Sequence, residues 1–164
     1  MTPPDSASTF EGPNLPAVGL VSELSDDDRA MLSSYGQFGF IQPLTTVIKQ
    51  GTPQDRLYFV ITGMLHAKRE DDGHETLLSP IGRGEWFGEI NIFDPAAASA
   101  TVSAVDSSQI WSIGREELLV FLGAYPEAAV QIMIGIATIV SRRLRSITEK
   151  LVSHAEYETF FSKE

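Results

Sequence analysis

The amino-acid sequence contains no cysteine. Disulfide bonds, thiol nucleophiles and zinc sites built on thiolates are therefore excluded. Histidine is scarce: His66, His74 and His154 are scattered along the chain and do not form the cluster with a carboxylate that a metal enzyme needs. No Ser/His/Asp arrangement and no glycine-rich loop for a nucleoside triphosphate stand out. We therefore expect no metal site and no enzymatic activity.

Basic residues are also few. The chain has 12 Lys and Arg against 22 Asp and Glu, a net charge of -10, which would repel a polyanion and argues against nucleic acid as a partner. The most apolar stretch, residues 128–140, is shorter than the roughly 20 residues of a membrane span. The first residues lack the basic start and apolar block of a secretory signal. We expect a cytoplasmic location and no membrane partner.

Proline, serine, threonine and glycine are frequent in the first residues of the chain. This composition is typical of segments that bury little apolar surface. We therefore expect residues 1–19 to be a flexible leader and residues 20–164 to form one domain. With 164 residues, 43% of them hydrophobic, the chain is long enough for a single buried core.

Short runs of β-branched and aromatic residues, separated by glycine and proline, occupy the middle of the chain. Asp72 and Gly73 predict a tight hairpin turn between two of these runs, because glycine accepts the positive φ that such a turn needs. Many short strands at this spacing favour a sandwich or a jelly-roll barrel. The predicted strands are residues 38–42, 46–49, 56–62, 64–70, 75–81, 100–104 and 107–113.

Helices are predicted on both sides of the strands. Ser25 followed by Asp28 is a helix N-cap pattern and predicts a short helix that ends near Gly36. Residues 115–123 predict a second short helix, and Glu127 begins a long one. We therefore expect a mainly β fold with flanking helices, namely a cupin-like β-roll (jelly roll) with a short N-terminal helix and a long C-terminal helix. The apolar residues of the long helix recur every three or four positions and are Ile132, Ile136, Ile139, Val140, Leu144, Ile147 and Leu151.

A glycine-containing motif follows the fifth predicted strand. Residues 84–95 have the sequence GEWFGEINIFDP, and residues 99–102 have the sequence SATV. With the spacing of Gly51, Gly63, Gly73, Gly84 and Gly88, this segment resembles the phosphate-binding cassette of cyclic nucleotide-binding domains, the family of the catabolite activator protein and of cyclic-AMP-dependent kinase regulatory subunits. The resemblance runs from about residue 24 to residue 151. It implies an eight-stranded β-roll that holds cyclic AMP or cyclic GMP, with the last helix beside the pocket as a lid.

The resemblance also implies a set of nucleotide-binding residues. Gly88 lets the backbone approach an anion, and a short helix beginning near Glu89 would direct free N–H groups towards it. Glu89 can accept hydrogen bonds from a ribose hydroxyl, and Ser99 can donate its hydroxyl and N–H to a phosphate oxygen. Hydroxyl side chains near the position of Thr148 meet the base in this family. The full set is Phe87, Gly88, Glu89, Ile90, Asn91, Ala98, Ser99, Ala100 and Thr148.

One residue departs from the family pattern. The family places an arginine just before the residue that Ser99 occupies, where it pairs with the cyclic phosphate, but this chain has Ala98 there. Removing one partner of a buried charge pair costs about 3–5 kcal/mol, so we expect cyclic-nucleotide binding to be weak or absent. Lys68, Arg83 and Arg56 are nearby in sequence, and nothing in the sequence places any of them at the phosphate.

The long helix allows two further expectations. Arg142, Arg143 and Arg145 are interpreted as a solvated face and not as a nucleic-acid patch. Apolar residues on more than one side of the helix are compatible with a homodimer seam, which is how the family often uses this helix. Residues 152–164 are too few for the helix-turn-helix domain that follows this helix in the family's transcription factors, so no DNA-binding domain is expected.

Three functions are compared. The first is a regulatory module that binds a cyclic nucleotide and signals through its C-terminal helix to a partner protein. The second is a degenerate domain that no longer binds cyclic nucleotide and acts as a protein-interaction module. Ala98 favours the second, whereas Phe87, Gly88, Glu89 and Ser99 favour the first. The third, a cupin-type enzyme, is disfavoured by the scattered histidines.

Overall fold

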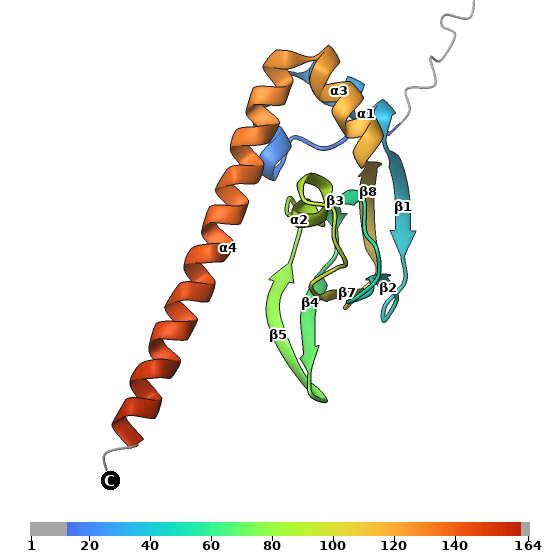
Figure 1. The fold of residues 1–164 in the computed structure, drawn as a ribbon. Helices are drawn as coiled ribbons and strands as arrows, with labels where there is room; N and C mark the ends of the chain where they lie inside the picture. Colours follow the sequence, from blue (N-terminus) through green and yellow to red (C-terminus); the bar gives the residue numbers. More distant parts are fainter. Residues whose placement is uncertain (1–12, 162–164) are drawn as a thin grey trace, which may run out of the picture.

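The molecule is a β-roll with helices at one end and a long helix along one side (Figure 1). The computed structural model describes residues 13–161, with side chains described to residue 153. In chain order the elements are η1 (Gly19–Glu23), α1 (Asp26–Tyr35), β1 (Gln37–Ile41), β2 (Thr46–Ile48), β3 (Arg56–Thr62), β4 (Leu65–Asp71), β5 (His74–Ile81), β6 (Trp86–Phe87), α2 (Glu89–Phe93), β7 (Thr101–Ala104), β8 (Ser108–Gly114), α3 (Arg115–Ala124) and α4 (Pro126–Phe161).

The strands form two antiparallel sheets, with the orders β1-β8-β3-β6 and β2-β7-β4-β5. The predicted β-roll with a short N-terminal and a long C-terminal helix is confirmed. Strand β3 is buried on both faces, because Leu57 and Phe59 pack on the helices while Tyr58 and Val60 pack inside the roll. This explains why its sequence is a continuous apolar run and not an alternation.

Two hydrophobic cores lie on either side of β3. The outer core joins the roll to the helices, with Trp86 and Trp111 packed against residues of α1, α3 and α4 such as Phe121 and Ile132. The inner core fills the roll and contains Phe87, Ala98 and Val102 together with residues of β3, β4 and β8. The predicted cassette therefore lies at the boundary between the two cores, since Trp86 belongs to one and Phe87 to the other.

Local sequence rules explain several element boundaries. The Ser25 hydroxyl accepts a hydrogen bond from the N–H of Asp28 at 3.1 Å and caps α1 as predicted. Asp72 and Gly73 have φ values of 50° and 77°, and the strands pair up to Asp71 and His74. The predicted hairpin between β4 and β5 is confirmed. Two elements were not predicted: the two-residue strand β6 and the 3₁₀ helix η1.

The packed domain begins before residue 20. Leu15 is 1% exposed in the outer core, and its N–H donates to the Ser33 hydroxyl at 2.8 Å. Val18 packs against the same core. Part of the segment expected as a leader therefore belongs to the packed domain, and residues 1–12 lie outside the described residues.

Helix α4 begins at Pro126, runs past η1 and continues along the side of the roll (Figure 1). Its first part is anchored by Ala128, Ile132 and Ile136, which are buried in the outer core. Its later apolar residues, Leu144 and Leu151 among them, are exposed. No helix in residues 13–161 is both long enough and apolar enough to cross a membrane.

Candidate functional site

Gly88 is the turn on which the site is built. It links β6 to α2 with a φ of 85°, in the left-handed region that favours glycine. A Cβ at this position would lie 2.4 Å from the backbone carbonyl oxygen of Arg56, closer than atoms can pack. The turn therefore needs glycine for two reasons, and it directs the next residue, Glu89, into the molecule.

Glu89, the first residue of α2, is 4% exposed. Its Oε1 accepts a hydrogen bond from the Arg143 guanidinium of α4, and the other end of the same guanidinium donates to the backbone carbonyl of Trp86. Arg143 is 29% exposed at its side chain. A buried carboxylate of the cassette is thus paired with a cation from the long helix, and the two elements are joined at this point.

The pairing corrects one expectation from the sequence. Arg143 was interpreted as part of a solvated face, and this is wrong because it contacts Glu89 and Trp86. The helix pattern predicts an inward position for Arg143, because residues 132, 136, 139 and 143 follow one another at intervals of three or four and lie on one face. Ile132 and Ile136 are buried, so Arg143 continues their buried stripe.

The neighbours of Glu89 divide between core and surface. Phe87 is 2% exposed and stacks on Tyr58 with ring centroids 4.7 Å apart. Burial raises the pKa of the Tyr58 phenol above its ordinary value. Asn91 is buried, and its side-chain amide donates to the carbonyl of Ala96 at 2.8 Å, which holds the loop after α2. Ile90 is 55% exposed and points away from the core.

The end of the cassette pairs with the turn that follows β2. Ala98 is 5% exposed in the inner core, and its N–H and carbonyl pair with the backbone of Thr52 and Gly51. The Ser99 side chain is exposed, and Ala100 is half-buried. The methyl group of Ala98 therefore occupies the inner face of the roll, where the family pattern places an arginine.

A different arginine lies beside Ser99. The Arg69 guanidinium of β4 donates to the Ser99 carbonyl at 3.1 Å and binds both carboxylate oxygens of Asp71, at 2.7 Å and 3.1 Å. Hydrogen bonding to Asp71 raises the pKa of Arg69. Arg69 was not among the cations that the sequence suggested as replacements.

The three basic residues that lie near the cassette in sequence have other partners or are exposed. Lys68 binds Glu75 at 2.7 Å on the outer face of β4, and Arg56 donates to the Ser112 hydroxyl at 3.1 Å. Arg83 is exposed in the turn before β6.

Thr148 is not joined to the cassette by any hydrogen bond of the described residues. Its hydroxyl donates to the carbonyl of Leu144 in its own helix at 3.0 Å, and the side chain is exposed. The structure therefore brings Phe87 and Ala98 together in the inner core and leaves Thr148 outside this group. Two polar side chains of the same helix donate hydrogen bonds to the roll. Arg143 does so as described, and the Lys150 ammonium group donates to the Leu78 carbonyl of β5 at 3.3 Å.

Among the side chains of residues 13–153, no group of three or more His, Asp or Glu is placed to hold a metal ion. The fold and the site define a class: a β-roll domain in which a short helix, introduced by a left-handed glycine, presents a buried carboxylate to a long C-terminal helix.

Comparison with known proteins identifies the family. The profile of the cyclic nucleotide-binding domain matches residues 40–125. The CRP-like cAMP-activated global transcriptional regulator of Mycobacterium tuberculosis is 33% identical over 107 residues, which are 65% of this chain and 46% of the regulator. This chain belongs to the cyclic nucleotide-binding domain family, and the resemblance found in the sequence is confirmed. The chain spans about half the length of the curated relatives it matches.

Solved structures agree with the assignment. The catabolite activator protein of Thermus thermophilus matches with a TM-score of 0.72 and 27% identity, covering 83% of this chain and 62% of that chain. The N-terminal domain of a transcriptional regulator from Streptomyces coelicolor matches with a TM-score of 0.64 and 29% identity, covering 80% of this chain and 90% of that chain. The shared region therefore includes most of the described elements.

Proposed function

We propose that the chain is a non-enzymatic regulatory module that binds a cyclic nucleotide, cyclic AMP or cyclic GMP, in the roll beside α2. The observation that carries the proposal is the buried Glu89 carboxylate at the start of α2. Arg143 engages its Oε1, and none of the hydrogen bonds of the described residues uses Oε2. A ribose hydroxyl can donate to that second oxygen. The name of the Mycobacterium tuberculosis relative, a cAMP-activated regulator, supports the same ligand class.

The remaining contacts of the proposed site follow from the cassette. Gly88 allows the ligand to approach the backbone, Phe87 and Ala100 line the apolar wall, and Ser99 donates to the phosphate. Ile90 and Asn91 shape the short helix and the loop that follows it. Thr148 is proposed to meet the base when α4 is closed over an occupied site.

The pair between Glu89 and Arg143 gives the module its output. A ligand hydroxyl that donates to Glu89 adds a second hydrogen bond to the carboxylate that Arg143 contacts, and Arg143 is part of α4. A ligand shifts a conformational equilibrium only by the difference in its affinity for the two states. We propose that the occupied and empty sites hold α4 differently, and that a partner protein binds to the helix in one of these states.

Helix α4 is also proposed to form a homodimer. Its exposed residues Val130, Met133, Val140, Leu144, Ile147 and Leu151, together with Ala137, recur at alternating intervals of three and four. This spacing is the pattern of a coiled-coil seam. At about 100° per residue, the seam lies roughly a quarter turn away from the face that carries Ile132, Ile136 and Arg143, so both contacts are compatible.

A second candidate function rests on Ala98. Its methyl group is buried in the inner core, and no guanidinium can extend from this position to a phosphate. In this alternative the pocket no longer binds a cyclic nucleotide, and the roll and α4 serve as a protein-interaction module.

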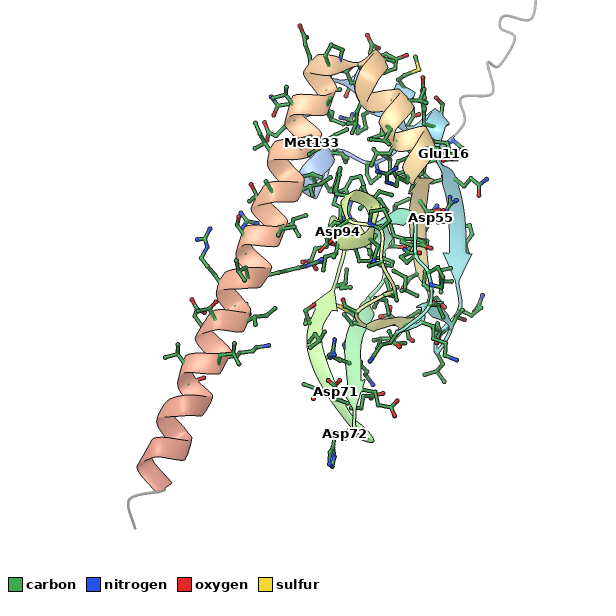
Figure 2. The ribbon with its side chains drawn as sticks, in the orientation of Figure 1. Asp55, Asp71, Asp72, Asp94, Glu116 and Met133 are labelled. Carbon is green, nitrogen blue, oxygen red and sulfur yellow. The ribbon has the colours of Figure 1, made fainter. Side chains whose placement is uncertain are left out.

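Calorimetric titration with cyclic AMP, cyclic GMP and a cyclic dinucleotide distinguishes the two functions. We expect binding of a cyclic mononucleotide, and we expect Glu89→Gln to weaken it about tenfold or more, because the variant loses a charge-assisted acceptor for the ribose. Glu116→Gln, an exposed acid on α3 labelled in Figure 2, is the matched control and should leave the affinity unchanged. Absence of heat with all three ligands at high micromolar concentration would support the interaction module instead.

A further inference from the structure

Arg69 lies on the inner face of the roll. Strand β4 pairs regularly with β7 from Leu65 opposite Ala104 to Lys68 opposite Thr101. Side chains alternate along a strand, and Leu65 and Ala67 pack in the inner core. Arg69 is the next residue in that alternation, so it projects on the same side as Ala98 and Val102, whereas Lys68 projects to the other side and binds Glu75.

The guanidinium of Arg69 is already in contact with the cassette. Its Nη1 donates to the Ser99 carbonyl, while Nε and Nη2 bind Asp71. A guanidinium has five N–H donors, so these three bonds leave a donor on each terminal nitrogen. The side chain is 46% exposed and can change rotamer without displacing core residues.

We propose that Arg69 supplies the positive charge that binds the ligand's phosphate, in place of an arginine at residue 98. This inference rests on the proposed function, because it concerns the same cyclic nucleotide in the same site. In the structure Arg69 is held by Asp71 near the tip of the β4–β5 hairpin, where Figure 2 labels Asp71. The ligand phosphate takes the place of part of this carboxylate contact. Arg69 then approaches the phosphate from β4, and Ser99 approaches it from the loop that leads into β7.

Asp71 therefore tunes the affinity. Its carboxylate competes with the phosphate for the same guanidinium and repels the ligand's negative charge. The arrangement binds more weakly than an arginine committed to the phosphate, since the contact with Asp71 must be given up. Binding is then weak because Arg69 is shared between Asp71 and the phosphate, and not because a cation is missing.

The test is a set of titrations with cyclic AMP in which the unmodified chain is compared with four single variants and one double variant. We expect Arg69→Gln to weaken binding about tenfold or more, and Asp71→Asn to tighten it severalfold. Lys68→Gln removes the same charge from the outer face of the same strand and should change the affinity less than about threefold. Thermal unfolding of each variant shows whether it is folded.

The fourth variant, Ala98→Arg, separates a role at the phosphate from a role in holding the hairpin. With an arginine at residue 98, the phosphate has its own cation, so adding Arg69→Gln should then cost less than about threefold. A loss that stays undiminished in the Ala98→Arg background would overturn the proposal, and so would equal affinities of Arg69→Gln and Lys68→Gln.

Two further outcomes distinguish this inference from the proposed function. If Ala98→Arg binds cyclic AMP and the unmodified chain does not, the pocket is competent and Arg69 does not supply the charge, so only the Arg69 proposal fails. If neither binds, the proposed function fails, and the role of Arg69 fails with it.

Discussion

At the scale of single residues, the pair of Glu89 and Arg143 is asymmetric. The carboxylate is 4% exposed, whereas the Arg143 side chain is 29% exposed and can be rehydrated if its partner is removed. A buried charge without a partner costs more than an exposed one. The two members of one ion pair should therefore contribute differently when each is removed.

We predict that Arg143→Ala destabilises the folded chain by about 2 kcal/mol and that Glu89→Gln costs less, about 1 kcal/mol. Arg143→Ala leaves a buried carboxylate without its cation, whereas Glu89→Gln leaves a guanidinium that is already partly exposed to water. Urea denaturation followed by the fluorescence of Trp86 and Trp111, both buried, measures the two values. Arg142→Ala, an exposed neighbour on α4, is the control and should be neutral. An equal cost for both variants would mean that Glu89 is hydrated in solution.

The site residues could be predicted from the sequence only where the requirement is local. Gly88 and the Ser25 cap are local, because a backbone angle or a hydrogen bond three residues away defines them. The partners of Glu89 and Ser99 are not local: Arg143 is 54 residues from Glu89, and Arg69 is 30 residues from Ser99. Periodicity places each of these arginines on an inward face, but only the packing of α4 and β4 on the roll determines what they meet.

At the scale of elements, the packing of η1 against α4 depends on Gly135. Leu20 of η1 packs directly over Gly135, and a Cβ at residue 135 would lie 1.3 Å from Leu20 Cδ1 and 2.5 Å from its Cγ. Leu20 would have to move. Gly123 of α3 is a second helical glycine, but a Cβ there meets nothing within 4 Å. The two glycines thus differ in packing and share the same low helix propensity.

We predict that Gly135→Ala destabilises the chain by about 1–2 kcal/mol, since the overpacking against Leu20 outweighs the gain in helix propensity. Gly123→Ala should be neutral or stabilise by up to about 1 kcal/mol, because only the propensity changes. Thermal unfolding of both variants provides the comparison. Stabilisation by Gly135→Ala would contradict the close packing of η1 on α4.

Elements with a strong periodic pattern were predictable, and short ones were not. The strands other than β6 match their predicted ranges within a few residues, because apolar runs and glycine turns define them, and the long helix begins one residue before its predicted start. Strand β6 has only two residues, and it is a strand because Tyr58 and Phe59 of β3 pair with it. Helix η1 is likewise held by tertiary packing, with Val21 fully buried in the outer core. Neither element has a pattern of its own long enough to recognise.

At the scale of the whole molecule, α4 has two apolar faces and uses one of them within the chain. Ile132 and Ile136 are buried against the roll, while Leu144 and Leu151 on the seam are 63% and 66% exposed. A continuous apolar stripe on a protein surface is unfavourable in water unless it is covered. The alternating spacing of three and four residues fits a second copy of the same helix, because each seam residue can pack into the seam of its partner.

We predict that the chain is a dimer in sedimentation equilibrium and that Leu144→Glu converts it to a monomer, because the variant places two carboxylates opposite each other in an apolar seam. Val120→Glu on α3 is the matched control: Val120 is 62% exposed, about as much as Leu144, and lies outside the seam, so this variant should remain a dimer. If the unmodified chain is a monomer at high micromolar concentration, the seam is not a dimer interface. If both variants are monomers, the interface is not confined to α4. Dimerisation that survives Leu144→Glu would place the interface elsewhere on the molecule, leaving the exposed face of α4 free for the proposed partner protein.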